Sequence, residues 1–173
     1  MDAWPRAITK GIRYPVNITT KEFKVATSLT RTLDKEHLAM YDDQMALSMA
    51  QQKIKKQYEL RIFFVGDALY TMAIFSQEDA KTQTDYRNYN HKKPNRFIPF
   101  TLPDHISQKL KVFIKKSGLD TGSIDIIYTP KGEYLFLEVN PVGQFSFVSF
   151  YCNYNLEKKI AEHLVSIANS AAA

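Results

Sequence analysis

Two short apolar segments separated by a turn are the feature that most constrains this chain. Residues 123–128 read SIDIIY and residues 134–139 read YLFLEV, and Pro130, Lys131 and Gly132 lie between them. Segments this rich in β-branched and aromatic side chains, joined by turn-forming residues, predict an antiparallel hairpin. This part of the chain is therefore expected to lie in a sheet.

A turn centred on Lys131 and Gly132 fixes which residues of the two strands face each other. In that register Asp125 lies opposite Glu138, and Asn140 follows on the same face because strand side chains alternate. The other face pairs apolar residues throughout: Ile124 with Val139, Ile126 with Leu137, and Tyr128 with Leu135. A bulge near the turn would shift the register by one residue, but the matched apolar pairs favour the unshifted register.

Two carboxylates and an amide on one face form a set of oxygen donors. Facing carboxylates repel each other unless a cation or a proton lies between them. Hard cations such as Mg²⁺ prefer oxygen ligands and often keep water or phosphate in their remaining positions. The sequence therefore predicts a magnesium–nucleotide site formed by Asp125, Glu138 and Asn140. The alternative is an ordinary surface pair of acids in a hairpin.

The remaining pattern predicts further strands and two helices. Gly66 and Asp67 form a hairpin turn between two strands, and residues 77–93 read as an irregular loop. Residues 34–50 have no clear pattern. This order predicts an α+β fold with a mostly antiparallel sheet and flanking helices, and residues 1–173 are expected to form one domain. The strands are expected over 6–9, 22–28, 61–65, 68–75 and 95–100, and the helices over 103–116 and 156–167.

Composition excludes several classes of protein. The chain has 173 residues, of which 45% are hydrophobic and 24% charged, and both values are ordinary for a globular domain. No apolar run approaches the roughly 20 residues that cross a membrane, and the N-terminus lacks the apolar core of a signal peptide. Cys152 is the only cysteine, which excludes an internal disulfide and favours a cytoplasmic location. This thiol is more simply a packing residue than a nucleophile.

The net charge of +5 attracts anions of several kinds, but no nucleic-acid motif accompanies it. We therefore expect neither a nucleic-acid nor a membrane partner. Arg61, Arg87 and Lys10 could neutralise phosphates. Taken alone, each arginine is more simply part of a surface salt bridge, and Lys10 is more simply a surface lysine. The chain has no Walker glycine loop, GxGxxG, GxSxG or HExxH motif, so phosphate would have to be held by a different scaffold.

Several segments of the chain, taken in the order in which they occur, resemble segments of the ATP-grasp ligases. Residues 51–54 resemble the hinge segment of the family, and the resemblance implies that Gln52, Lys53 and Ile54 contact adenine through their backbone. Glu59-Leu60-Arg61 resembles an Asp-x-Arg pattern whose acid holds the ribose.

Two further segments extend the resemblance. Asp85-Tyr86-Arg87-Asn88 is similar to the Asp-Phe-Arg-Ser-Asn segment of the ribosomal-protein glutamate ligases, where the arginine and the residues after it approach the nucleotide and phosphates. Lys10 resembles the lysine on the strand that covers the nucleotide, although YPVNITTKEF stands where the family has a glycine-rich loop. The resemblance implies ATP and Mg²⁺ as cofactors, with Asp125, Glu138 and Asn140 as metal ligands.

A narrower resemblance is to the grasp-with-spasm peptide maturases, the graspetide or microviridin-type ligases. It rests on KKPNR (92–96), TGSIDI (121–126), FLEVNPVGQF (136–145) and CNYNLEKKIA (152–161). Such enzymes activate a side-chain carboxylate of a ribosomally made precursor peptide as an acyl phosphate. A Ser, Thr or Lys side chain of the same peptide then attacks, which gives an ester or an amide.

The family has a further N-terminal, pre-grasp region, so this chain is expected to be a partial, C-terminal portion of such a ligase. Two other functions stay open: a non-catalytic module that binds nucleotide or peptide, and a ligase that adds glutamate to a protein. A homodimer is compatible with the sequence, which does not determine the oligomeric state.

Overall fold

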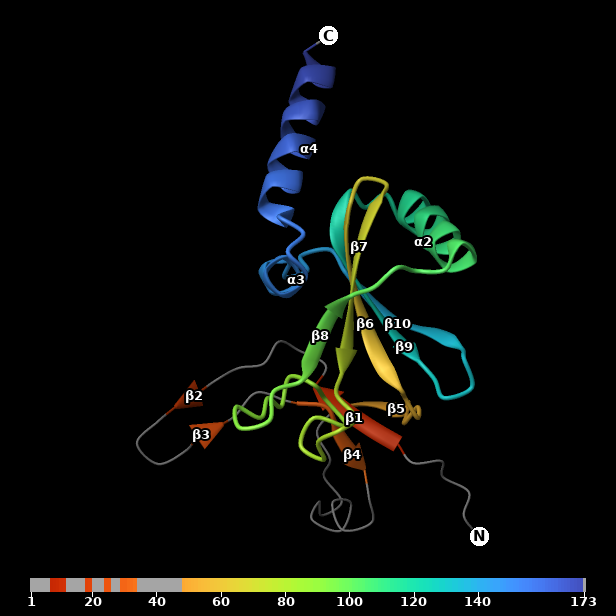
Figure 1. Ribbon diagram of the computed structural model, residues 1–173, viewed down its shortest axis with the longest axis vertical. Coiled ribbons are helices and arrows are strands. Elements are labelled where there is room, and N and C mark those ends of the chain that lie inside the picture. The colour runs from red at the N-terminus through yellow and green to blue at the C-terminus, as the bar shows by residue number, and fades with distance from the viewer. Residues whose placement is uncertain (1–6, 12–17, 20–23, 26–28, 34–47, 173) are drawn as a thin grey trace. The chain divides into compact units, whose positions relative to one another are not determined.

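The computed structural model describes residues 7–11, 18–19, 24–25, 29–33 and 48–172 of the chain (Figure 1). The chain divides into two compact units. The first consists of Met1–Lys55 and Glu78–Pro94, and the second of Lys56–Gln77 and Asn95–Ala173. The expectation of one domain over residues 1–173 stays a prediction, because two compact units can belong to one domain.

The second unit contains a five-stranded antiparallel sheet with three helices, which confirms the α+β prediction. The strand order is β10-β9-β6-β7-β8. The strands are β6 (Tyr58–Val65), β7 (Ala68–Phe75), β8 (Arg96–Pro99), β9 (Thr121–Tyr128) and β10 (Tyr134–Asn140). The helices are α2 (Asp104–Ser117), α3 (Ser146–Cys152) and α4 (Leu156–Ala171).

A two-residue turn joins the central strands β6 and β7, as predicted. Val65 pairs with Ala68, and Gly66 has a φ of +52°. A positive φ at the first central position is typical of hairpin turns that match the right-handed twist of strands, and glycine adopts it without strain. This turn sets the register in which β6 pairs with β7, from Val65 with Ala68 to Glu59 with Ile74.

Helix α2 covers one face of the sheet. Pro103 precedes its first turn, and Gly118 ends it in the left-handed conformation with a φ of +67°, as is common at helix C-termini. Leu110 and Ile114 are buried, and Ile106 and Phe113 pack beside them, so the apolar side of the helix faces the core. The buried core consists of Leu60, Ile62, Phe64, Ala73, Leu102, Leu110, Ile114, Ile124 and Ile126.

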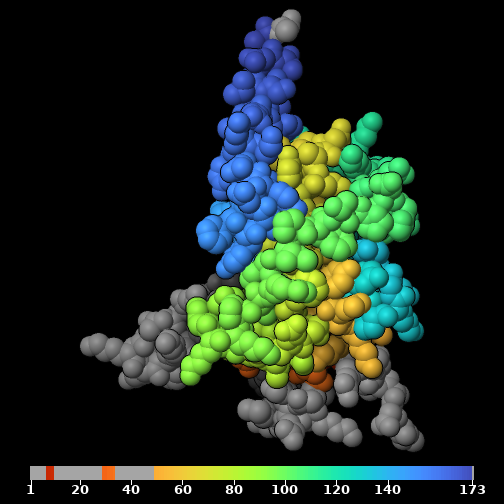
Figure 2. Space-filling view, viewed as in Figure 1, coloured from red at the N-terminus to blue at the C-terminus, as the bar shows by residue number. Residues whose placement is uncertain are grey.

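Helix α3 lies against the opposite face of the sheet. The ring of Phe97 in β8 lies 4.8 Å from Phe147 and 4.5 Å from Tyr151, measured between centroids. Helix α4 follows and extends away from the sheet (Figures 1 and 2). Its first residue, Leu156, is buried, whereas the apolar side chains of Leu164, Val165 and Ile167 are exposed.

The first unit contains small antiparallel sheets and a long loop. Strands β1 (Ala7–Gly11), β4 (Arg31–Leu33) and β5 (Ser48–Gln52) form a sheet with the order β4-β1-β5. Strands β2 (Ile18–Thr19) and β3 (Lys24–Val25) form a second pair.

Residues 77–93 contain neither helix nor strand, as predicted. The predicted strand at 22–28 coincides with β3 only at its centre, and its other residues lie outside the described ones, as do residues 34–47. No helix in the described part of the chain combines the length and apolar character needed to cross a membrane.

Two substitutions in α2 test the assignment of its buried side. Ile114→Ala removes a side chain that is 4% exposed, and Val112→Ala removes one that is 54% exposed. The first should lower the free energy of unfolding by about 2–5 kcal/mol, because it leaves a cavity in the core. The second should change it by no more than about 0.5 kcal/mol. Urea unfolding followed by circular dichroism measures both, and equal losses would contradict the packing described here.

Candidate functional site

The β9–β10 hairpin places the predicted acids opposite each other. Asp125 pairs with Glu138, Ile124 with Val139, and Asn140 with Ser123. The register predicted for this end of the hairpin is therefore confirmed.

The register predicted near the turn is wrong by one residue. Ile126 pairs with Phe136 instead of Leu137, and Tyr128 pairs with Tyr134 instead of Leu135. The shift occurs between Phe136 and Glu138, where Leu137 is the extra residue of a β-bulge.

Aromatic packing explains the bulge. In the unshifted register Phe136 would lie opposite Ile127, on the face that carries the acids. The bulge turns Phe136 to the other face, where its ring lies 5.3 Å from Phe113 of α2. It also places Tyr134 beside Tyr128, with ring centroids 4.8 Å apart, and Tyr128 stacks on Tyr58.

Three neighbouring strands bring their polar residues to the same face of the sheet. Arg61 of β6 pairs with Asp125 of β9, and Asp125 pairs with Glu138 of β10. Paired residues in antiparallel strands share a face, and Asn140 lies two residues beyond Glu138. The other face of these strands carries the buried core. The hypothesis that Asp125, Glu138 and Asn140 lie on one face is therefore supported.

Arg61 and Asp125 form an ion pair in the middle of this face. Nη1 of Arg61 donates to Oδ1 of Asp125 at 3.0 Å and to Oδ2 at 2.7 Å. The two side chains are only 14% and 18% exposed. An ionised carboxylate accepts several hydrogen bonds, and this contact orients the carboxylate of Asp125.

The turn after β10 orients Asn140. Its Oδ1 accepts a hydrogen bond from the backbone N–H of Val142 at 3.0 Å, and its backbone oxygen accepts one from Gly143 at 3.1 Å. A Cβ on Gly143 would lie 2.0 Å from Oγ of Ser123 and 2.7 Å from its backbone nitrogen. Only glycine therefore fits this close approach. The hydroxyl of Ser123 is buried and has no hydrogen-bond partner within the described residues.

Glu59 lies two residues before Arg61 and is buried. Its Oε1 accepts from Nζ of Lys56 at 2.5 Å, and its Oε2 accepts from Oγ of Ser76 at 2.5 Å. Nε2 of Gln77 donates in turn to Oγ of Ser76 at 2.9 Å. Both oxygens of Glu59 thus have partners that fix the carboxylate. Its role in holding a ribose stays a prediction.

The other predicted site residues belong to the first unit: Lys10, Gln52, Lys53, Ile54, Arg87 and Asn88. Lys10 lies in β1 opposite Met49, and Gln52 ends β5 opposite Ala7. Gln52 is exposed and Ile54 is half-buried. These positions leave the nucleotide roles of Lys10, Gln52 and Ile54 as predictions.

Arg87 is held by a carboxylate next to it in the loop. Its Nε and Nη2 donate to the two carboxylate oxygens of Asp85 at 2.9 and 2.6 Å. Burial alone would raise the pKa of Asp85, but hydrogen bonds from the side chain of Arg87 and from the N–H of Thr30 outweigh burial and lower it. The alternative that Arg87 forms a salt bridge is therefore confirmed, and its contact with phosphate stays a prediction.

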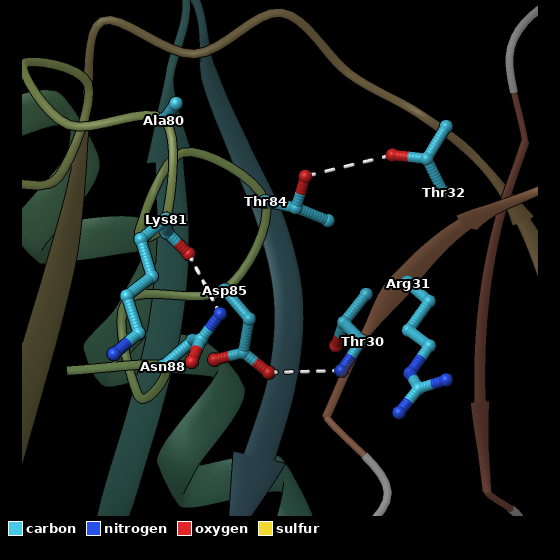
Figure 3. Close-up of a pocket in the computed structure, with 8 residues that line it drawn as sticks. All are labelled: Thr30, Arg31, Thr32, Ala80, Lys81, Thr84, Asp85 and Asn88. Atoms are coloured by element: carbon cyan, nitrogen blue, oxygen red, sulfur yellow. Dashed lines mark hydrogen bonds between the residues drawn. The ribbon is translucent and has the colours of Figure 1, made fainter.

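A polar pocket of about 310 Å³ lies in the first unit (Figure 3). Its lining residues are Thr30, Arg31, Thr32, Ala80, Lys81, Thr84, Asp85 and Asn88. Asn88 is a predicted site residue, and its Nδ2 donates to the backbone oxygen of Lys81 at 3.0 Å. The threonines were not predicted. Thr32 lies in β4 and Thr30 directly precedes that strand, and their spacing of two residues was the available signal.

The donors on the sheet face fit a hard cation. Within the described residues, no group of three or more His, Cys, Asp or Glu side chains is placed to hold a metal ion. The set proposed here has two carboxylates and one amide, which are oxygen donors of the kind that Mg²⁺ prefers and Zn²⁺ does not. Cys152 offers no alternative nucleophile, because burial raises its pKa to about 11.

No family model and no curated protein sequence matches the chain. Solved structures do match it. A RiPP-associated ATP-grasp ligase from Chryseobacterium gregarium, solved with ADP and a leader and core peptide, has a TM-score of 0.81 and 28% identity. The match covers 93% of this chain and 48% of that one.

The macrocyclase MdnC from Microcystis aeruginosa MRC, bound with its precursor peptide MdnA, has a TM-score of 0.73 and 34% identity. That match covers 92% of this chain and 49% of MdnC. The ATP-grasp ligase PsnB, solved with Mg, ADP and a variant of its minimal precursor, has a TM-score of 0.68 at 18% identity, which shows a likeness of fold alone. The chain spans about half the length of these proteins.

Gly143→Ala tests the close approach that orients Asn140. The added methyl group overlaps Ser123 and must displace the turn, so the free energy of unfolding should fall by about 1–3 kcal/mol. Val142→Ala is the matched control, because Val142 is 86% exposed and should tolerate the change. Thermal unfolding of both variants measures the difference. A Gly143→Ala protein as stable as the wild type would show that the turn does not pack on Ser123.

Proposed function

We propose that this chain, which has the fold of the ATP-grasp ligases, forms the nucleotide- and metal-binding part of a ligase. That ligase would use ATP to modify a ribosomally made peptide. One observation carries this proposal. One sheet face carries Arg61, Asp125, Glu138 and Asn140. The match to a peptide macrocyclase, at 34% identity, covers 92% of this chain. Two similar proteins were solved with their peptides, which makes a precursor peptide the proposed partner.

The residues of the sheet face would hold Mg²⁺ and the phosphates of ATP. Asp125, Glu138 and Asn140 supply oxygen donors, and the bound cation would neutralise part of the phosphate charge. Arg61 fixes the carboxylate of Asp125 and adds positive charge beside it. Glu59, whose two oxygens are held by Lys56 and Ser76, offers a rigid acceptor for the ribose hydroxyls.

The first unit would supply the remaining contacts to the nucleotide. In this proposal the backbone of Gln52, Lys53 and Ile54 contacts adenine, while Lys10, Arg87 and Asn88 approach the phosphates. These roles follow from the resemblance of their segments to the family. Arg87 could contact an anion and still keep Asp85 as its partner, because the side chain of Arg87 is 56% exposed.

The reaction has two steps. A side-chain carboxylate of the peptide attacks the γ-phosphorus of ATP, the bond to the β-phosphate oxygen breaks, and an acyl phosphate and ADP form. A Ser or Thr hydroxyl, or a Lys amine, of the same peptide then attacks the acyl carbon, loses its proton and releases phosphate. The product is an ester or an amide. This reaction needs no covalent intermediate with the protein, which would contribute by positioning and by stabilising charge.

Nucleotide binding by wild type and matched variants tests the site. Calorimetry with Mg²⁺ and a non-hydrolysable ATP analogue should show magnesium-dependent binding to the wild type. Glu138→Gln should weaken it about tenfold or more, because it removes a charged ligand. Glu133→Gln is the control, since Glu133 is an exposed acid beside the turn of the same hairpin. Equal affinities of the wild type and Glu138→Gln would refute the metal assignment.

Release of phosphate from ATP distinguishes the proposed ligase from the two alternatives. A peptide ligase should release phosphate only when a precursor peptide with acidic and hydroxyl side chains is added. A binding module would bind nucleotide and release none. A glutamate-adding ligase would require free glutamate and a protein substrate.

A further inference from the structure

We propose that the pocket of the first unit binds an oxyanion through Lys53, Thr32 and Thr84. The inference goes beyond the proposed function, because all three residues lie outside the sheet face that would hold the metal. The hinge resemblance gave Lys53 a role only through its backbone, so the role of its ammonium group is not assigned.

Three segments distant in the sequence converge at this point. Nζ of Lys53, which follows β5, donates to Oγ1 of Thr32 in β4 at 2.8 Å. It also lies 3.5 Å from Oγ1 of Thr84 in the loop. The two threonine hydroxyls lie 3.5 Å apart and point toward each other (Figure 3). The ammonium group of Lys53, which is not itself a lining residue, therefore contacts the hydroxyls of two residues that line the pocket.

Among the described residues, no acid balances the charge of Lys53. Its side chain is half-buried, its hydrogen bonds go to neutral hydroxyls, and no carboxylate pairs with it within the described residues. A partly buried charge without a countercharge is costly. A bound anion would remove this cost.

The acid that lines the pocket does not supply this countercharge. Asp85 accepts hydrogen bonds from the guanidinium of Arg87 and from the N–H of Thr30. Arg87 thus neutralises Asp85. The other charged lining residues, Arg31 and Lys81, are both positive. The pocket therefore carries an excess of positive charge.

The donors suit a carboxylate or a phosphate. A hydroxyl that accepts a hydrogen bond from an ammonium group keeps its own proton to donate, so Thr32 can act together with Lys53 on one oxyanion. Hydrogen bonds from a charged donor to an anionic oxygen are the strongest of this type. A volume of about 310 Å³ admits a carboxylate side chain or a phosphate group. The net charge of +5 also favours an anionic ligand.

Two probes distinguish the sources of such an oxyanion. One is inorganic phosphate, which represents the phosphate of a nucleotide. The other is a short, end-blocked peptide with one glutamate, which represents an acidic peptide side chain. Titrations followed by NMR use neither Mg²⁺ nor nucleotide, so a failure of the proposed metal site would not affect them.

The variants are Lys53→Met, the near-isosteric Thr32→Val, and the control Lys55→Met. Lys55 is exposed and lies two residues from Lys53, so its substitution removes the same charge from the surface. We expect the wild type to bind at least one probe, and Lys53→Met and Thr32→Val each to weaken binding about tenfold, which is the usual effect of losing one charge-assisted hydrogen bond. Lys55→Met should bind as the wild type does.

A loss for phosphate alone would identify a phosphate pocket, and a loss for the peptide alone would identify a pocket for an acidic side chain. Either result, or both, supports the proposal. The proposal is overturned if the wild type binds neither probe, if Lys53→Met and Thr32→Val bind as the wild type does, or if Lys55→Met loses as much affinity. The last result would assign binding to general surface charge. Thr32→Val keeps the charge and shape of the unit, so it remains informative if Lys53→Met does not fold.

Discussion

The ion pair between Arg61 and Asp125 is the interaction on which the candidate site depends. It joins the strands β6 and β9 at the centre of the sheet, and both side chains are largely buried. The opposite face of the same strands packs on α2 and carries the core. A slip of one residue in register would exchange the two faces and bury the charges. Burial of residues such as Leu60 and Ile62 therefore determines where Arg61 and Asp125 lie.

The sequence predicted this part of the site because the relevant constraints are local. Counting from the turn at Lys131 and Gly132 placed Asp125 opposite Glu138 and Asn140 on the same face, as the structure has it. The bulge at Leu137 could not be predicted in the same way. It depends on contacts of Phe136 with α2 and of Tyr134 with Tyr128, and tertiary packing of this kind leaves no local signature. The resemblance to the ATP-grasp ligases of ribosomally made peptides was also predicted, and the likeness of the solved structures confirms it at the level of fold.

Residues from separated segments were the hardest to predict. Thr32, Lys53 and Thr84 form no motif, since 21 and 31 residues separate Lys53 from its two partners. The pairing of β1 with both β4 and β5 brings two of these segments together. Arg87 shows the converse. Its segment resembles a phosphate-contacting one, yet its guanidinium is held by Asp85, and the sequence left both interpretations open. The structure gives Arg87 a carboxylate partner, and its contact with phosphate stays a prediction.

The central claim is that the face formed by Asp125, Glu138 and Asn140 holds a cation and the phosphates of a nucleotide. A crystal structure of the chain with Mn²⁺ in place of Mg²⁺ and a non-hydrolysable ATP analogue tests it most directly, because the anomalous signal locates the metal. We expect the metal within about 2.0–2.3 Å of oxygens of Asp125 and Glu138, with Arg61 still in contact with Asp125. A metal bound elsewhere, or nucleotide phosphates that lie away from this face while Asp125 contacts only Arg61, would contradict the claim.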